Sequence, residues 1–135
     1  MALKPTTWIA TFIAFITLDA LWFKLVVGDF FHQRLLPLID SENGSIKLKY
    51  FEAGFVYFFL TLGLLTLVAT PKKATLTEAL IYGAIYGLVV YGVYDFTNRA
   101  VLKHWPWDFM LVDIAWGSVS CALVSGLAFY LEKQS

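Results

Sequence analysis

The segment TWIATFIAFITLDALWFKLVV, residues 7–27, decides the fold of this chain. It has the length of about 20 residues that one α-helix needs to cross the roughly 30 Å of hydrocarbon in a bilayer. Asp19 and Lys24 are its only charged residues, and Pro5 precedes it. Because proline is favoured in a first helical turn, the helix is expected to open there. The segment therefore predicts a transmembrane helix.

Three further segments share this length and apolar character, at residues 51–69, 76–98 and 109–131. The first of these stops before Pro71, and the next follows Thr75-Leu-Thr-Glu78, which has the form of a capping box. Asp108 is expected to be the N-cap of the last one. The sequence therefore predicts an all-α integral membrane protein, a four-helix bundle with four transmembrane spans running up and down.

The connections between the predicted spans differ in length. The link at residues 70–74 is a tight turn, and the one between the third and fourth spans is short and polar. The longest link follows the first span, with a turn signal at residues 40–44 and a candidate interfacial helix at residues 29–39. Since no boundary divides the chain, we expect one transmembrane domain over residues 1–135.

The composition excludes several classes of protein. The chain is 59% hydrophobic and 15% charged, against about 45–50% and about 25% in ordinary soluble domains. Its formal net charge is zero, so it has no nucleic-acid-binding signature. A single cysteine, Cys121, excludes an intrachain disulfide and a multi-cysteine metal site. We predict no metal site and identify no cofactor.

Three acids lie in or at the edge of the apolar segments, namely Asp19, Asp95 and Asp113. A carboxylate near the middle of a bilayer costs about 3 kcal/mol on insertion scales, so such a residue is a functional candidate by default. Asp19 and Asp113 also share a signature, because each is followed three residues later by a tryptophan, Trp22 and Trp116.

An up-down bundle places these acids at one face of the membrane. Asp19 is late in the first span, Glu52 early in the second, Asp95 late in the third and Asp113 early in the fourth. Because consecutive spans run in opposite directions, all four acids reach the same side. The other half of each span is expected to be almost purely apolar.

We therefore predict a polar site around these acids. Tyr91, Asp95 and Asn98 are spaced so that one helical face presents a phenol, a carboxyl group and an amide. Indoles can donate hydrogen bonds and form flat walls for a cation or a planar ligand. The predicted binding residues are Asp19, Trp22, Tyr91, Asp95, Asn98, Asp113 and Trp116, with Glu52, Arg99, His104 and Trp105 in secondary roles. No catalytic residue is assigned.

Structural interpretations compete with this site. Tryptophan and tyrosine favour membrane interfaces in any case. Asp19 can instead pair with Lys24 or Arg99 as a bridge between helices, and Glu52 and His104 fit residues at the membrane surface. Small residues recur every four positions in two stripes, which favours helix packing within one bundle over a dimer interface. These stripes are Ala79, Gly83 and Gly87, and Gly117, Cys121 and Ser125.

Three blocks of sequence resemble a known family. They are Leu18-Asp19-Ala20-Leu21-Trp22, Tyr94-Asp95-Phe96-Thr97-Asn98-Arg99-Ala100 and Val112-Asp113-Ile114-Ala115-Trp116-Gly117. Together with Trp105-Pro106 and Tyr57-Phe58, they are similar to a bacterial family of small predicted membrane proteins, domain of unknown function 2177. The resemblance covers essentially the whole chain and implies a multi-pass protein of the bacterial inner membrane with four helices. It implies no catalytic residues.

Three functions remain open. We favour the binding or translocation of a small cationic or proton-linked solute, because the acids offer charge compensation and the tryptophans offer walls. The second is a membrane-embedded enzyme on a lipid or isoprenoid-like substrate, with one of the aspartates as general acid or base. The third is a structural or assembly protein. The expected partners are the bilayer, a small-molecule or lipid ligand, and a second copy of the chain in a homodimer.

Overall fold

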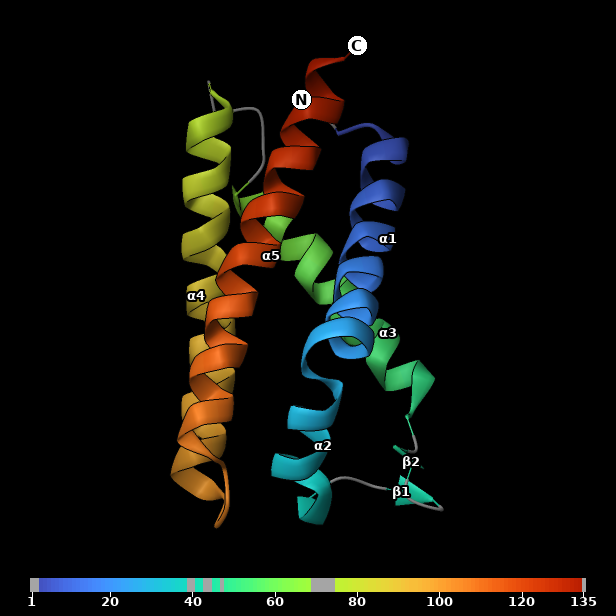
Figure 1. Cartoon of the computed structure of the whole chain (residues 1–135). Helices are drawn as coiled ribbons and strands as arrows, with labels where there is room; N and C mark the ends of the chain where they lie inside the picture. Colours follow the sequence, from blue (N-terminus) through green and yellow to red (C-terminus); the bar gives the residue numbers. More distant parts are fainter. Residues whose placement is uncertain (1–2, 39–40, 43–44, 47, 69–74, 135) are drawn as a thin grey trace.

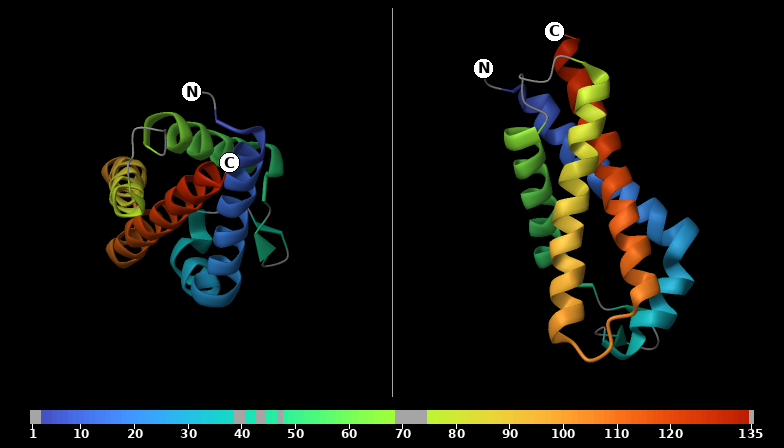
Figure 2. Two further views of the ribbon diagram at one scale, coloured as in Figure 1. Left: turned by 90° about the horizontal axis from the view of Figure 1, so that it is seen from above. Right: turned by 90° about the vertical axis from the view of Figure 1, so that its left-hand side faces the viewer.

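The structure is a computed structural model that describes residues 3–38, 41–42, 45–46, 48–68 and 75–134. In these ranges, four helical stretches are long and apolar enough to cross a membrane, at Pro5–Leu38, Tyr50–Val68, Leu76–Val101 and Trp107–Lys133. They pack as a bundle with both ends of the chain at the same end of the molecule (Figures 1 and 2). The predicted all-α membrane bundle with four spans is confirmed.

The first stretch is longer than the predicted span. It comprises α1 (Pro5–Trp22), a π-helical segment (Phe23–Val27), α2 (Gly28–Leu35) and a 3₁₀ turn (Leu36–Leu38). The helix expected at residues 29–39 thus follows directly from the first span, although Ile39 is outside the described residues. A π-helical segment is a recognised cause of helix bending, and α2 does not continue along the axis of α1 (Figure 1).

The other elements are α3 (Tyr50–Gly63), which ends in a π-helical segment (Leu64–Val68), α4 (Leu76–Val101) and α5 (Trp107–Lys133). Two short strands, β1 (Ser41–Glu42) and β2 (Ser45–Ile46), form an antiparallel pair. β1 lies within the turn expected at residues 40–44, and β2 follows it directly. The tight turn expected at residues 70–74 lies outside the described residues.

The helix starts test the two capping predictions. The Thr75 hydroxyl accepts a hydrogen bond of 3.1 Å from the backbone N–H of Glu78, which confirms the predicted start of α4. The N-cap prediction for Asp108 is wrong, because Pro106 occupies that position. The Asp108 carboxylate instead forms a 2.9 Å salt bridge with Arg34 of α2. The backbone of Pro106 is extended, with φ −67° and ψ 138°, as is typical of an N-cap residue.

Helices α4 and α5 are in close contact along the two stripes of small residues. A Cβ atom added at Gly83 would lie 2.6 Å from the carbonyl oxygen of Cys121, and one added at Gly87 would collide with the backbone of Gly117. The Ser118 hydroxyl also donates a 2.9 Å hydrogen bond to the Ala84 carbonyl. The stripes therefore serve packing within the chain, and the backbones approach as small-residue motifs allow in lipid.

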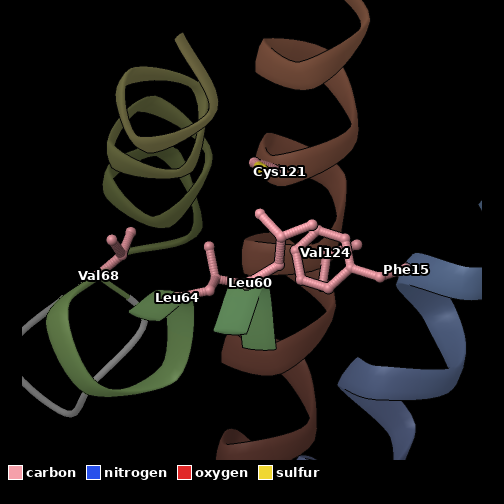
Figure 3. Packing of buried hydrophobic residues seen from close by; sticks show 6 residues of the cluster. All are labelled: Phe15, Leu60, Leu64, Val68, Cys121 and Val124. Atoms are coloured by element: carbon pink, nitrogen blue, oxygen red, sulfur yellow. The ribbon is translucent and has the colours of Figure 1, made fainter. Parts of the chain in front are cut away.

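A second set of contacts joins α1, α3 and α5. Phe15 of α1 and Val124 of α5 point toward Leu60 of α3 and Leu64 of the π-helical segment that follows it, with Cys121 nearby (Figure 3). All of these side chains are buried. The outside of the bundle is equally apolar: Leu67 is 76% exposed and other large apolar side chains are more than half exposed on every long helix. Such a surface suits a lipid environment.

The half of the bundle near the termini is less apolar than expected. It buries the hydroxyls of Thr7, Thr11, Thr61 and Ser125. Thr7 binds the carboxylate of Glu132, whereas the other three hydroxyls have no hydrogen-bond partner among the described residues. The prediction of an almost purely apolar half is therefore wrong at these four positions.

We predict that the contact between α4 and α5 is intolerant of a single methyl group. Gly87→Ala should lower the free energy of unfolding by about 1–3 kcal/mol, the usual cost of overpacking. Gly92→Ala is the matched control on the same helix, because a Cβ at Gly92 meets nothing within 4 Å. Unfolding in mixed micelles, followed by circular dichroism, measures both. Equal effects of the two substitutions would contradict the packing described.

Candidate functional site

The polar groups gather at the end of the bundle away from the termini. The last turns of α4 and the first turns of α5 form this end of the bundle, whereas α1 ends nearer its middle, close to α3 (Figure 1). Asp19, Asp95 and Asp113 come together near this end because consecutive helices run in opposite directions, whereas Glu52 of α3 is exposed. Helix α2 lies at the same end, where Phe30 and Phe31 pack against Phe109 of α5.

Asp19 is the centre of a hydrogen-bond network between three helices. Its Oδ1 accepts a 2.8 Å hydrogen bond from the indole N–H of Trp116, and its Oδ2 accepts one of 2.8 Å from the hydroxyl of Tyr57. Hydrogen bonds to a charged group each contribute about 1.5–3 kcal/mol. Two neutral donors, rather than Lys24 or Arg99, therefore compensate the carboxyl group of Asp19.

The two Asp-x-x-Trp frames interlock. Trp22 stacks on Trp116 with ring centroids 4.3 Å apart and an interplanar angle of 3°. Trp116, from the frame of Asp113, thus binds the acid of the other frame, Asp19. Each tryptophan lies one turn from its own acid in sequence, but the hydrogen bond and the ring stacking run between α1 and α5.

Asp95 is completely buried, with 0% of its surface exposed. Its Oδ1 accepts a 3.0 Å hydrogen bond from the indole N–H of Trp105. Its Oδ2 is buried and has no donor among the described residues. The side chains of Asp95 and Asp113 are hydrogen-bonding neighbours. Asp95 and Asp113 can share this hydrogen bond only if one of them holds a proton, since a carboxylate has nothing to donate.

Arg99 holds the link between α4 and α5 rather than an acid. Its guanidinium donates a 2.6 Å hydrogen bond to the backbone carbonyl of Trp105 and lies 4.5 Å from the ring centroid of Trp107. The Trp105 ring also contacts Tyr94 edge-on at 5.9 Å. Arg99 therefore fixes the segment that brings the Trp105 indole to Asp95.

Asp19, Trp105, Asp113 and Trp116 border a cavity of about 890 Å³ between the helices. Its walls come from all four spans and from α2, and most of them are apolar or aromatic. The polar side chains on the walls are those of Asp19, Tyr86, Tyr91, Tyr94, Asn98, Trp105, Asp113 and Trp116. No lysine, arginine or histidine belongs to the lining formed by the described residues.

The predicted site residues divide into three groups. Lining the cavity are Asp19, Tyr91, Asn98, Asp113, Trp116 and Trp105. Two stand behind that lining, because Trp22 covers Trp116 and Asp95 contacts Asp113. The other three, Glu52, Arg99 and His104, are exposed at the outer surface. The structure thus brings eight of the eleven to the cavity or directly behind it.

Sequence reasoning missed the role of three phenols. Tyr57 binds Asp19, Tyr86 lines the cavity, and Tyr94 lines it while hydrogen-bonding Asn98. The sequence did contain a signal for Tyr57, because an up-down bundle places this residue at the same depth in the membrane as Asp19. A tyrosine near a membrane end is so common that depth alone did not distinguish it. No cluster of three or more histidine, cysteine, aspartate or glutamate side chains suited to a metal occurs in the described part of the chain.

We predict that the Trp116–Asp19 hydrogen bond stabilises the bundle. Trp116→Phe keeps an aromatic ring against Trp22 but removes the N–H, so it should cost about 1–3 kcal/mol in unfolding free energy. In an Asp19→Leu background the same substitution should cost much less, because no carboxyl group is left unpaired. The measurement is a double-mutant cycle in micelles. Trp8→Phe, in the separate cluster with Leu65 and Ala128, is the control. Additive effects of the two substitutions would argue against the network.

A comparison with protein families gives one match. The model of a family described as predicted membrane protein (DUF2177) matches residues 5–130, from the first turn of α1 to near the end of α5. Comparisons with curated proteins and with solved structures gave no match. The match includes every acid and tryptophan of the site, and it confirms the resemblance seen in the sequence. The chain therefore belongs to the DUF2177 family of predicted membrane proteins.

Proposed function

We propose that the protein binds small amphipathic cations in the cavity and moves them through the membrane. The observation that carries this proposal is the lining of the cavity, which combines Asp19 and Asp113 with aromatic walls and has no basic side chain among its described residues. Ligand sites are typically apolar cavities of about 300–1,000 Å³ with a few polar groups that orient the ligand. The cavity falls within that range.

The charge of the lining favours a cation over an anion. An anion would have to approach two acids in a medium of low dielectric, where repulsion between like charges is strong. A cation would be attracted by the acids and by the faces of Tyr91, Tyr94 and Trp116, which border the same space. The predominance of apolar walls suits a cation whose body is apolar.

The three acids support this proposal unequally. Asp19 and Asp95 each accept an indole N–H, so part of their role is to hold the structure together, although the partners are not the Lys24 or Arg99 proposed for Asp19. Asp113 lines the cavity, and no indole N–H binds it in the described part of the chain. We therefore assign to Asp113 the direct contact with a bound cation.

A second candidate is an enzyme acting on an isoprenoid-like lipid. The contact between the carboxyl groups of Asp95 and Asp113 beside apolar walls favours it, because such a pair can supply a general acid and base. Its substrate would be largely neutral, so this function predicts no preference between a lipophilic cation and an anion of the same shape.

Dimerisation and location complete the proposal. A second copy would lengthen the path available for translocation, but the stripes of small residues are already used within the chain. A dimer would therefore have to form through the apolar outer surface. We expect the protein in the inner membrane of a bacterium, surrounded by lipid on all four spans.

We predict that the purified protein in lipid nanodiscs binds tetraphenylphosphonium and not tetraphenylborate, an anion of nearly the same shape. Asp113→Asn should weaken the binding of tetraphenylphosphonium at least about tenfold, equivalent to about 1.4 kcal/mol. The physical reason is the loss of a negative charge from the wall of the cavity. Equilibrium dialysis, corrected with empty nanodiscs, measures these affinities.

The control for this experiment is Glu52→Gln. Glu52 is an exposed acid in the first turn of α3 and is not part of the lining. Its substitution removes one carboxylate from the same end of the protein and should leave the affinity unchanged. The proposed function is wrong if the cation and the anion bind equally, or if Asp113→Asn and Glu52→Gln behave alike.

A further inference from the structure

In the contact between Asp95 and Asp113, only one of the two carboxyl oxygens of Asp95 has a hydrogen-bond donor in the described part of the chain. Asp95 is fully buried, and its Oδ1 accepts the Trp105 indole N–H at 3.0 Å. Its Oδ2 is buried and has no other donor among the described residues. The carboxyl group of Asp113 is the hydrogen-bonding neighbour of the Asp95 side chain and also forms part of the cavity wall. The pair thus joins a completely buried acid to one that a ligand can reach.

Two negative charges in this position would repel each other with little screening. Carboxyl groups in direct contact therefore share a proton, as in other sites built from paired acids. A proton held between Asp113 and Asp95 supplies the donor that the Oδ2 of Asp95 otherwise lacks. The arrangement then carries one negative charge in place of two.

The described side chains that face the pair from the neighbouring helices offer no positive charge that could neutralise it. Asp19 approaches it from α1, and Tyr91 and Tyr94 approach it from α4. On α3, Tyr57 is bound to Asp19. Arg99, from the last turn of α4, is directed to the Trp105 carbonyl. Within the described residues, a cation that neutralised the fully ionised pair would have to come from a ligand.

We propose that the pair exchanges one proton for one bound cation, which makes the site a cation–proton exchanger. The inference rests on the proposed function, since it requires that a cation enter the cavity. When the cation binds beside Asp113, the O–H bond of the shared proton breaks and the proton passes to water. The cation then balances the second negative charge. On release of the cation, a proton from water restores the pair.

Calorimetry measures this exchange directly. Titration of the protein with tetraphenylphosphonium in two buffers of different ionisation enthalpy gives the number of protons released per cation. We expect about one for the unaltered protein and for Glu52→Gln. Asp95→Asn should still bind the cation but release almost none, because the introduced amide donates to Asp113 in place of the proton and keeps an oxygen for Trp105.

Infrared spectroscopy tests the pair without any ligand. The C=O stretching band of a protonated carboxyl group should be present in the unaltered protein and in Glu52→Gln. It should be absent from Asp95→Asn and from Asp113→Asn. Asp113→Asn gives the same readout if Asp95→Asn does not fold.

The outcomes separate the two proposals. Binding of tetraphenylphosphonium without release of a proton, or release that persists in Asp95→Asn, overturns the exchange and leaves the cation site intact. Absence of the infrared band from the unaltered protein overturns the shared proton. Failure of the unaltered protein to bind the cation at all overturns both the proposed function and the exchange.

Discussion

The hydrogen bonds that compensate Asp19 are the constraint on which the arrangement of helices depends. A carboxyl group in the apolar part of a membrane is costly unless donors surround it. Here Trp116 of α5 and Tyr57 of α3 each supply one donor at 2.8 Å to an acid of α1. These bonds determine which faces of three helices meet. The stacking of Trp22 on Trp116 then restricts the rotation of α1 further.

The fourth helix is placed by a different interaction. Helix α4 has close backbone contact with α5 through Gly83 and Gly87, and the ring of Tyr91 covers Gly117 so closely that a Cβ there would collide with it. One turn farther along, this contact brings Asp95 against Asp113. Helix α4 packs on α5, and α1 packs on α5 and α3. The cavity lies between these two well-packed interfaces.

Much of this architecture was predictable because membranes restrict the available structures. The four apolar lengths, the capping box at Thr75 and the meeting of Asp19, Asp95 and Asp113 at one end all follow from the sequence pattern and from alternating helix directions. The partners were not predictable, because depth does not give rotation about a helix axis. The sequence could not show that Trp116 binds Asp19 rather than its own neighbour Asp113. Nor could it show that Arg99 binds a backbone carbonyl.

The central claim is that the space between the acids and the aromatic side chains is a cation site. A crystal structure with tetraphenylarsonium tests it most directly, because arsenic can be located by its anomalous scattering. We predict one arsenic peak inside the cavity, between Asp113 and Trp116, with Asp19 still bound to the Trp116 indole. A peak only on the apolar outer surface, or a cavity filled by inward rearrangement of the helices, would contradict the account.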